Sequence, residues 1–434
     1  VFLLCLLSGL SICWFNTVCF VLCIKNFPST RPLALSLTVS FNGLSAALYN
    51  LIATSFSTSS SAIYLLLNAL LPLITSLIAL LPILRQPPPQ QPHADVLRRD
   101  QLTFIKLKLL AVVTGFYLLL LHPTGPSASR ALFAGAVFLL LLPYGIPGIL
   151  YARNWFGRTV LSSFPVDGSG FLLVDDETLE LHKELISREN SLNDYGDPEG
   201  CFPTDELLVL GIEHGAWMLV RRFDFWLYYV AYFCGGTIGL VYSNNLGQIA
   251  QSLGHSSYNP MLITIYSSFS FFGRLLSAAP DYARRRFYFA RTGWLAIALI
   301  PTPFAFLLLT AQGDRFMAVE AGTGLIGLSS GFIFAAAVSI TSELFGPESV
   351  GVNHNILITN IPIGSLLYGF MAATVYDSHT VRKGDSVVCM GRECYYLTFM
   401  LWGGISLLGL VSSLALFVRT RPAYRRFEQS RRQR

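Results

Sequence analysis

The chain has 434 residues, of which 53% are hydrophobic and only 13% are charged, with a formal net charge of +5 and a mean hydropathy of +0.53. A soluble domain carries about 25% charged residues, so this chain has too little charge to cover a water-facing surface. A large soluble protein is therefore excluded, and we expect an all-α membrane protein with the lipid bilayer as its solvent.

Apolar runs of the length that crosses a bilayer, roughly 20 residues, recur along the whole chain. They predict eleven transmembrane helices, at residues 1–24, 33–56, 62–84, 104–121, 131–152, 224–253, 259–279, 289–311, 319–344, 351–376 and 395–418. The chain begins with Val1, inside the first run and without an initiator Met. We therefore expect an N-terminally truncated fragment of a longer protein.

Two hydrophobic blocks flank a polar middle. Residues 1–152 hold the first five helices, an incomplete N-terminal lobe, and residues 223–420 hold a C-terminal lobe of six. Residues 153–222 form an acidic linker that ends in "DELLVLGIEHGAWMLVRR", which predicts an amphipathic helix at the membrane surface. Residues 421–434 form a basic tail. Two helical blocks joined by a long loop are the layout of a two-lobed transporter.

Lysines and arginines are spread unevenly over the two sides of this topology. If the loops alternate sides, 25 of the 30 fall on the side that holds the linker and the tail. Cytoplasmic loops carry such an excess, so we expect the linker and the C-terminus in the cytoplasm. The net charge is then a topology signal, and it gives no reason to expect a nucleic-acid partner.

In the first block, "CIKNFPSTRPLALSLTVSFNGLSAALYN" (23–50) places polar residues on one face of a helix, among them Asn42 as a substrate-path candidate. Its Asn-Phe-Pro followed by Arg resembles the hinge between the fourth and fifth helices of oxalate/formate-antiporter-like members of the major facilitator superfamily. This resemblance implies that three helices precede the chain. It also implies that helices 104–121 and 131–152 are an extra pair.

The stretch "CGGTIGLVYSNNLGQIAQSLGH" (234–255) is rich in amides for a membrane helix. At 100° per residue, its amide residues fall within one arc of about 120° and its glycines on the other side. These substrate-path candidates are Asn244, Asn245, Gln248 and Gln251. An unsatisfied amide in hydrocarbon costs several kcal/mol. The amide face therefore meets either water and a solute or the polar groups of neighbouring helices.

The end of the next helix, "SFFGRLLSAAPDYARRR" (270–286), resembles the loop signature of the major facilitator superfamily, in which an acidic residue and basic partners form a charge latch. The match is partial, since Ser277 stands in place of a glycine and Tyr282 in place of a basic residue. A positive-inside anchor is the alternative. The latch candidates are Gly273, Arg274, Asp281, Arg284, Arg285 and Arg286.

Other candidates lie nearer the C-terminus. Asn353 and Asn360, seven residues apart, share a helix face and extend the predicted substrate path. Glu343 is either a helix-end residue or a latch partner. Cys389 and Cys394 share the longest outside loop and are a candidate disulfide.

Motifs for catalysis or metal binding do not emerge from the sequence. "GLSSG" (327–331) matches a hydrolase motif literally, but it lies within a predicted membrane helix and lacks the strand–turn–helix context that the motif needs. The cysteines and histidines form no metal-ligand cluster. We therefore expect neither an enzyme nor a bound cofactor or metal.

Four segments together look like the plant nodulin-like, nuclear-fusion-defective family of the major facilitator superfamily: "NFPSTRPLALSLTVSFNGLSAALYN", "GGTIGLVYSNNLGQIAQSLG", "YFARTGWLAIALIPTPFAF" and "SELFGPESVGVNHNILITNIPIGSLLYG". The resemblance implies a two-lobed, major-facilitator-type bundle with no defined substrate. We hypothesise a secondary transporter that moves a small solute, with or without a coupling ion, by alternating access. The alternative is a non-transporting membrane receptor or organelle-membrane factor that acts through the acidic linker.

Overall fold

The computed structural model describes residues 2–27, 30–55, 61–84, 94–121, 126–160, 209–283, 288–383 and 386–432. The chain forms two compact units, one of Val1–Leu141 with Glu206–Arg434 and one of Leu142–Asp205. The second unit is described only for residues 142–160, which are helical. All packing discussed below belongs to the first unit.

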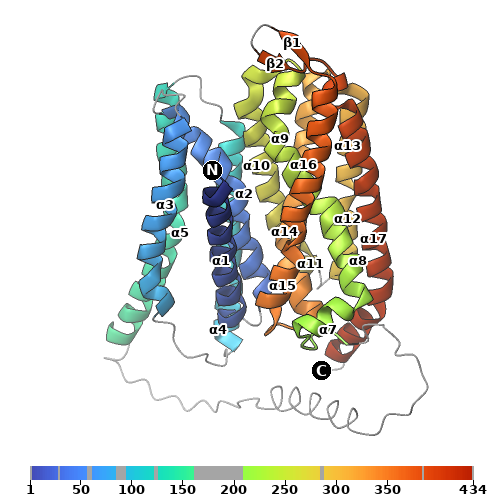
Figure 1. Cartoon of the computed structure of the whole chain (residues 1–434). Helices are drawn as coiled ribbons and strands as arrows, with labels where there is room; N and C mark the ends of the chain where they lie inside the picture. Colours follow the sequence, from blue (N-terminus) through green and yellow to red (C-terminus); the bar gives the residue numbers. More distant parts are fainter. Residues whose placement is uncertain are drawn as a thin grey trace, which may run out of the picture. The chain divides into compact units, whose positions relative to one another are not determined.

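Helices make up nearly all of the described residues (Figure 1). The first block holds α1 (Phe2–Asn26), α2 (Arg31–Ser55), α3 (Ser61–Leu84), α4 (Ala94–Leu120) and α5 (Pro126–Val160). The second block begins with α7 (Ala216–Arg221), α8 (Phe223–Tyr232), a π-helical turn (Phe233–Thr237), α9 (Ile238–Ser252), a 3-10 turn (Ser256–Tyr258), α10 (Asn259–Leu276) and α11 (Ala279–Ala283). It continues with α12 (Arg291–Leu299), α13 (Pro301–Gln312), α14 (Phe316–Phe345), α15 (Val350–Ile358), α16 (Asn360–Ser378), β1 (Val381–Lys383), β2 (Ser386–Val388) and α17 (Glu393–Arg432).

Within the described residues, seven helical segments are long and apolar enough to cross a membrane: Arg99–Leu120, Phe223–Ser252, Ser256–Ala283, Arg291–Gln312, Phe316–Phe345, Val350–Ser378 and Glu393–Gln429. Three shorter apolar segments lie in α1, α3 and α5. α2 belongs to neither set. The protein is a multi-pass membrane protein by these criteria, and the eleven predicted spans stay a prediction.

Three local features go beyond the sequence prediction or differ from it. The all-α prediction misses β1 and β2, which pair antiparallel between α16 and α17. Of the helix predicted near the end of the linker, residues 209–222 are described, and only α7 among them is helical; the Gly211 and His214 nitrogens bind elsewhere. The predicted tail from residue 421 continues α17 as helix to Arg432.

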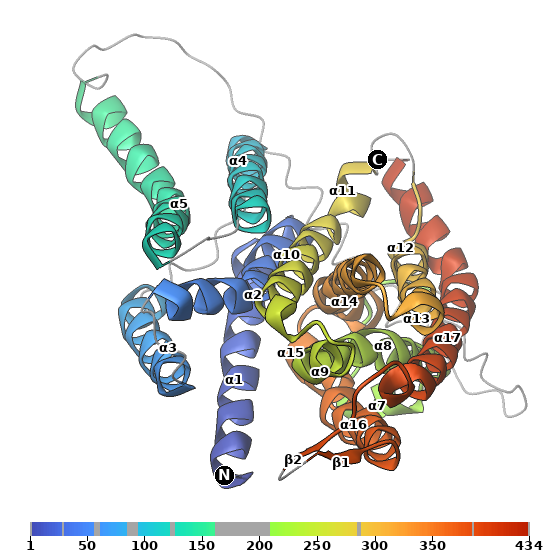
Figure 2. The ribbon, with the colours of Figure 1, turned by 90° about the horizontal axis from the view of Figure 1, so that it is seen from above.

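α14 is the central helix of the second block, with α10 on one side and α12 and α13 on the other (Figure 2). Its glycines let α10 approach at backbone distance. A Cβ on Gly331 would lie 2.1 Å from the Ser270 carbonyl oxygen, and one on Gly273 would lie 2.1 Å from the Leu328 carbonyl oxygen. Each helix thus contributes a glycine to the contact, and neither position tolerates a side chain.

The two blocks meet along α2 and α10. Arg274 donates from Nη1 to the Val39 carbonyl oxygen over 3.0 Å. On one side of this bond, a Cβ on Gly43 would lie 2.8 Å from the Phe271 nitrogen. On the other, Ala34 and Ala278 belong to one buried cluster. The N-terminal half of α2 therefore lies against the C-terminal half of α10.

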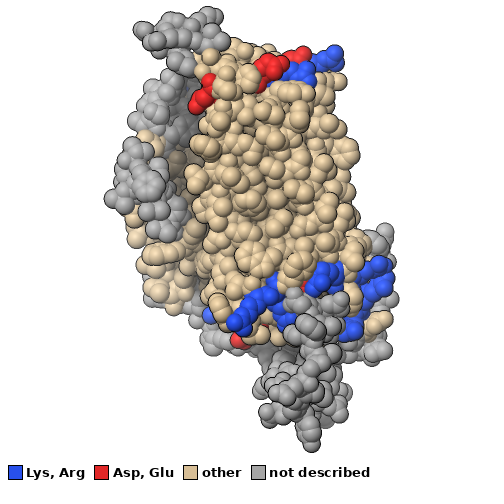
Figure 3. All heavy atoms as spheres, turned by 45° about the vertical axis from the view of Figure 1, so that its right-hand side comes forward, with Lys and Arg blue, Asp and Glu red and all other residues tan. Residues whose placement is uncertain are grey.

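Charged side chains gather at the two ends of the face drawn in Figure 3, with a broad uncharged band between them. We call the end that carries α7 and α11 the Arg291 end, and the end that carries β1 and β2 the hairpin end (Figure 1). A band without charge is what a helix bundle presents to the hydrocarbon core of a bilayer.

Replacing Gly331 by alanine tests the contact between α10 and α14. We expect Gly331→Ala to destabilise the protein by about 1–3 kcal/mol, because the added methyl group overlaps backbone that cannot move aside. Gly369→Ala in α16 is the matched control, since a Cβ there meets no atom within 4 Å. The unfolding midpoint in detergent reports both changes, and equal midpoints for the two variants would contradict the account.

Candidate functional site

A network of charged and polar side chains closes the Arg291 end. Arg291, the first residue of α12, is 5% exposed. Its Nη2 donates to Asp281 Oδ1 over 2.8 Å, and its Nε donates to Glu343 Oε1 over 2.9 Å. The Tyr424 hydroxyl donates to Glu343 Oε2 over 2.9 Å. This Arg291 network (Asp281, Arg291, Glu343 and Tyr424) joins α11, α12, α14 and α17.

One guanidinium serves two carboxylates in this network. The fork of an arginine presents several donors in one plane, which allows Arg291 to bind Asp281 and Glu343 at once. The shared cation offsets the repulsion between the two carboxylates. Asp281 Oδ2 is buried and has no hydrogen-bond partner among the described residues. The Oδ2 atom of Asp281 is therefore free to accept a further hydrogen bond.

A second ion pair ties α8 to α17 near the same end. Asp224, which is fully buried, accepts from Arg419 Nε over 2.7 Å. The Arg419 guanidinium also lies 5.1 Å from the centroid of the Phe223 ring. Together with Tyr424, this pair places two contacts of α17 at the Arg291 end.

The predicted latch residues take different places. Asp281 binds Arg291, while Arg274 binds α2 and lies 5.4 Å from the centroid of the Phe334 ring. Gly273 packs against α14 and touches no charge of the network. Arg284, Arg285 and Arg286 lie outside the described residues. The sequence analysis missed Arg291, whose position at the start of an apolar run is also that of an ordinary positive-inside arginine.

Residues 211–215, which precede α7, bind the loop between α14 and α15. The Gly211 and His214 nitrogens donate to the Glu343 and Phe345 carbonyl oxygens over 2.8 and 3.0 Å. Glu213 accepts from the Glu348 and Ser349 nitrogens over 2.8 and 2.9 Å. A carboxylate at this point also favours the N-terminus of α15. The segment lies beside Glu343, so it adjoins the Arg291 network.

The loop that receives Glu213 turns at Gly346. Gly346 has a φ of 95°, a conformation that favours glycine. A Cβ at this position would lie 2.4 Å from the Glu213 Cδ. Gly346 therefore supplies both the turn and the space for the carboxylate.

His214 lies on the same segment and is buried. Its Nδ1 is 2.8 Å from the Ile212 carbonyl oxygen, and its ring makes an edge contact with Phe345. Burial lowers the pKa of His214 below its usual value, and the bond to Ile212 opposes this shift. The folded protein therefore favours the neutral imidazole.

The amide face of α9 is the exposed side of that helix. Asn244, Gln248 and Gln251 are exposed, and Asn245 is half-buried and donates to its own helix at the Val241 carbonyl oxygen over 2.8 Å. Gln248 Oε1 accepts from the Tyr395 hydroxyl over 3.0 Å. The exposed polar surface of this helix therefore comes mainly from Asn244 and Gln251. The sequence placed all four on one arc of the helix. In the structure they differ in exposure and in hydrogen-bond partners.

The other predicted path residues lie elsewhere. Asn353 and Asn360 are fully buried. Asn353 Nδ2 donates to the His214 carbonyl oxygen over 2.9 Å. Asn360 Oδ1 accepts from the Thr237 hydroxyl over 2.6 Å. Asn42 is exposed on α2 and donates to Asn16 of α1 over 3.3 Å. The two buried asparagines join segments of the second block.

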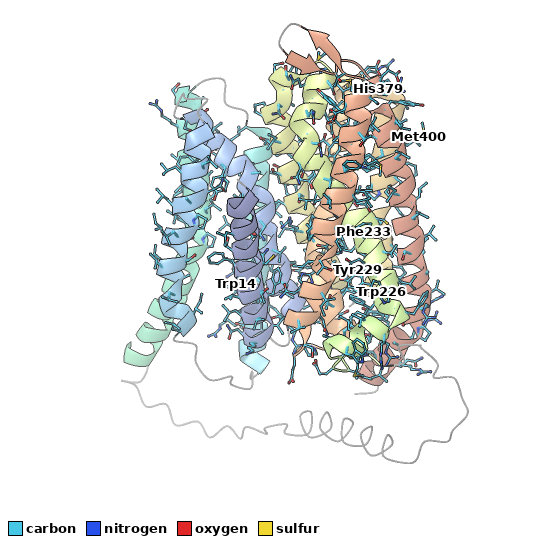
Figure 4. The ribbon with its side chains drawn as sticks, in the orientation of Figure 1. Trp14, Trp226, Tyr229, Phe233, His379 and Met400 are labelled. Carbon is cyan, nitrogen blue, oxygen red and sulfur yellow. A yellow bond between two sulfur atoms is a disulfide. The ribbon has the colours of Figure 1, made fainter. Side chains whose placement is uncertain are left out.

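The bond to Asn360 starts from the π-helical turn between α8 and α9. Such turns shift the helix register and leave a carbonyl group without its usual partner. Here the Phe233 carbonyl oxygen accepts from the Tyr368 hydroxyl of α16 over 3.3 Å. Trp226, Tyr229 and Phe233 form an aromatic row that leads up to this turn (Figure 4). The turn therefore fixes how α8 and α9 lie against α16.

At the hairpin end, a disulfide joins Cys389 and Cys394. Within the turn that it closes, the Gly391 nitrogen donates to the Ser252 carbonyl oxygen at the end of α9 over 2.7 Å. Arg392 donates from Nη2 to the Thr310 carbonyl oxygen of α13. The disulfide turn thus bridges α9 and α13, and the next residue, Tyr395, reaches Gln248.

The described residues contain no group of three histidine, cysteine or acidic side chains that could hold a metal ion. A small pocket lies between α1, α14 and α15, lined by Thr17, Phe20, Val338, Val350, Gly351 and His354. It has the size of a water site and not of a solute site. His354 is buried there, with its ring edge-on to Phe20.

Both blocks match models of known protein families. Residues 1–148 match the model described as Nodulin-like, and residues 209–426 match the model described as NFD4, C-terminal domain. The Protein NUCLEAR FUSION DEFECTIVE 4 of Arabidopsis thaliana is 55% identical over 437 residues, which cover 99% of this chain and 74% of that protein.

Two fungal proteins are more distant relatives. The Probable transporter MCH1 of Yarrowia lipolytica is 27% identical over 191 residues, which cover 41% of this chain and 38% of that protein. The Probable transporter mch1 of Neurospora crassa is 21% identical over 290 residues, which cover 56% of this chain and 47% of that protein. These similarities span less than half of either fungal protein.

Removing the shared cation tests the Arg291 network. We expect Arg291→Met to destabilise the protein by about 3 kcal/mol, the lower end for buried pairs because both carboxylates keep some exposure. The unfolding midpoint in detergent measures the loss. Arg421→Met, at an exposed arginine of α17, should change the midpoint little. Adding Asp281→Asn and Glu343→Gln to Arg291→Met should recover most of the loss, and no recovery would refute the electrostatic explanation.

The lowered pKa of His214 predicts a pH dependence of stability. Between the lowered folded pKa and the usual pKa of about 6.5, the unfolded chain binds more protons than the folded protein. Stability is therefore complete above this window and is lost as the pH falls through it. Thermal unfolding between pH 7.5 and 5.5 should show a smaller midpoint loss in His214→Gln than in wild type. His379→Gln, at an exposed histidine, should leave the loss unchanged; an equal effect of both variants would rule out His214 as its source.

Proposed function

Because the chain belongs to the nodulin-like family with an NFD4 C-terminal domain, we propose that it is a secondary transporter of the major facilitator type. It moves a small solute across a membrane by alternating access between two helical lobes. Residues 1–152 belong to the first lobe, and residues 223–420 form the second. The similarity to proteins named as probable transporters supports this proposal.

The observation that carries the proposal is the exposed amide face of α9. Side chains that face lipid are apolar, as the exposed side of α16 illustrates with Ile363, Leu366 and Phe370. The exposed side of α9 presents Asn244 and Gln251 instead. An amide at membrane depth requires hydrogen-bond partners. We assign this face to the solute path, together with Asn245, Gln248 and the more remote Asn42.

The solute class follows from the chemistry of this face. Its members Asn244, Asn245, Gln248 and Gln251 are all amides, and none carries a charge. Amides both donate and accept hydrogen bonds. The face therefore favours a neutral or weakly charged solute with hydroxyl, amide or carbonyl groups. The buried residues Asn353 and Asn360 act in this account by holding the path helices and not by touching the solute.

The Arg291 end is the cytoplasmic gate in this proposal, in line with the excess of lysines and arginines on that side. The blocks meet there through the Arg274 bond to Val39 and through the packing of Ala34 and Ala278. The latch consists of Asp281 and Arg274 with the neighbouring Arg284, Arg285 and Arg286, and Gly273 provides the close contact of α10 with α14. Solute release to the cytoplasm requires these contacts to separate.

A non-transporting receptor is the second candidate, and one observation favours it. Residues 211–215, at the end of the acidic linker, bind the α14–α15 loop next to the Arg291 network. A partner that pulls on the linker would act directly on this loop. Deletion of residues 185–200 leaves this attachment intact, and it should spare transport but abolish a function that depends on a linker partner.

The transport proposal is tested with full-length protein in oocytes or vesicles that are exposed to a mixed metabolite pool read by mass spectrometry. We expect wild type to move at least one solute and Asn244→Ala/Gln251→Ala to lose most of that movement, because the exposed amides bind it. Gln312→Ala is the matched control, since Gln312 is an exposed amide at the end of α13 and lies outside this face. All variants must reach the membrane. Equal movement by wild type and the double variant would reject the solute path, and failure of any solute to move would favour the receptor.

A further inference from the structure

Lys108 is a buried lysine on α4, one of the two helices that the sequence marks as an addition to the first block. Its side chain is 9% exposed, and its Nζ is buried without a hydrogen-bond partner among the described residues. The Nζ lies 5.2 Å from the centroid of the Tyr282 ring. A buried ammonium without a hydrogen bond is costly, so its position calls for an explanation.

The explanation lies in the residue before Tyr282. Asp281 binds Arg291 through Oδ1, while its Oδ2 is buried and lacks a donor among the described residues. The Lys108 Nζ lies over the ring of Tyr282, the residue that follows Asp281 in α11. An unused donor and an unused acceptor of opposite charge thus lie on adjoining elements at the Arg291 end.

The packing of α4 holds Lys108 in this position. Phe104, one helical turn earlier, lies in the buried cluster of Ala34 and Ala278 and makes an edge contact with Phe27 at 5.0 Å between centroids. Residues four apart share a helix face. The face of α4 that reaches the junction of α2 and α10 therefore carries Lys108, whereas Lys106 is exposed.

We propose that Lys108 is a positioning residue of the transport cycle and a second cation for Asp281, supplied by the first block. In the present structure Arg291 holds Oδ1. As the cytoplasmic gate closes fully, α4 brings Lys108 to the free Oδ2, so that Asp281 is held by one cation from each block. As the gate opens, α4 carries Lys108 away, and Arg291 keeps the carboxylate paired. This inference rests on the proposed function, and it gives the added helix α4 a role in gating.

Transport kinetics test this second cation once a solute is known. We expect Lys108→Met to lower the maximal rate about tenfold with an unchanged KM, because the gate and not the solute site is affected. Lys108→Arg should restore most of the rate, since it keeps a cation at this position. Lys106→Met, with the same change of charge on the exposed side, should leave the rate unchanged. Lys108→Met/Asp281→Asn should be no slower than Asp281→Asn alone.

A second readout does not depend on the solute. In Asp281→Asn protein, Lys108 is a buried cation without its carboxylate. The change in unfolding midpoint caused by Lys108→Met should therefore be more favourable in this background than in wild type, by about 2 °C or more. This coupling would stand even if no solute moved, an outcome that would reject the proposed function but not the charge pair. The proposal would be overturned if Lys108→Met changed the midpoint equally in both backgrounds. It would also be overturned if the rate losses of Lys108→Met and Asp281→Asn multiplied in the double variant.

Discussion

The buried charge of Arg291 is the constraint on which one end of this protein depends. A guanidinium without water needs carboxylates, and these come from two other elements, with Asp281 on α11 and Glu343 on α14. Tyr424 brings α17 into the same network through Glu343. The connecting segment at residues 211–215 then binds the backbone around Glu343. One cation thus organises the ends of four helices and the attachment of the linker.

The middle of the second block depends on a different interaction. α10 and α14 approach so closely at Gly273 and Gly331 that backbone atoms replace side chains in the contact. Such packing is rigid, because it leaves no side chain that could change its rotamer. A rigid helix pair that ends in an ion-pair network is suited to move as one body, which carries Asp281 toward or away from the first block. That combination is the physical basis of the gate that we propose.

The sequence predicted the helices well because apolar runs of bilayer length are a strong and local pattern. It also placed Asn244 and Asn245 on one arc, but it could not tell that the first is exposed and the second turns back to Val241. That difference depends on neighbours far away in the chain. The same limit applies to Asn353, whose partner is the His214 carbonyl oxygen 139 residues earlier. The sequence did not single out Arg291, because an arginine at the start of an apolar run gives no sign of whether its side chain is buried.

The central claim is that the junction between α2 and α10 at the Arg291 end opens during transport. A cross-link between Ala34→Cys and Ala278→Cys, two small buried residues of one cluster, tests it most directly. The background lacks the six cysteines other than Cys389 and Cys394, and both single-cysteine variants, each with one of the two introduced residues, receive the same reagent. The account predicts that uptake of the solute found by mass spectrometry falls to background only in the cross-linked protein. Uptake by the cross-linked protein at the rate of the single-cysteine variants would contradict it.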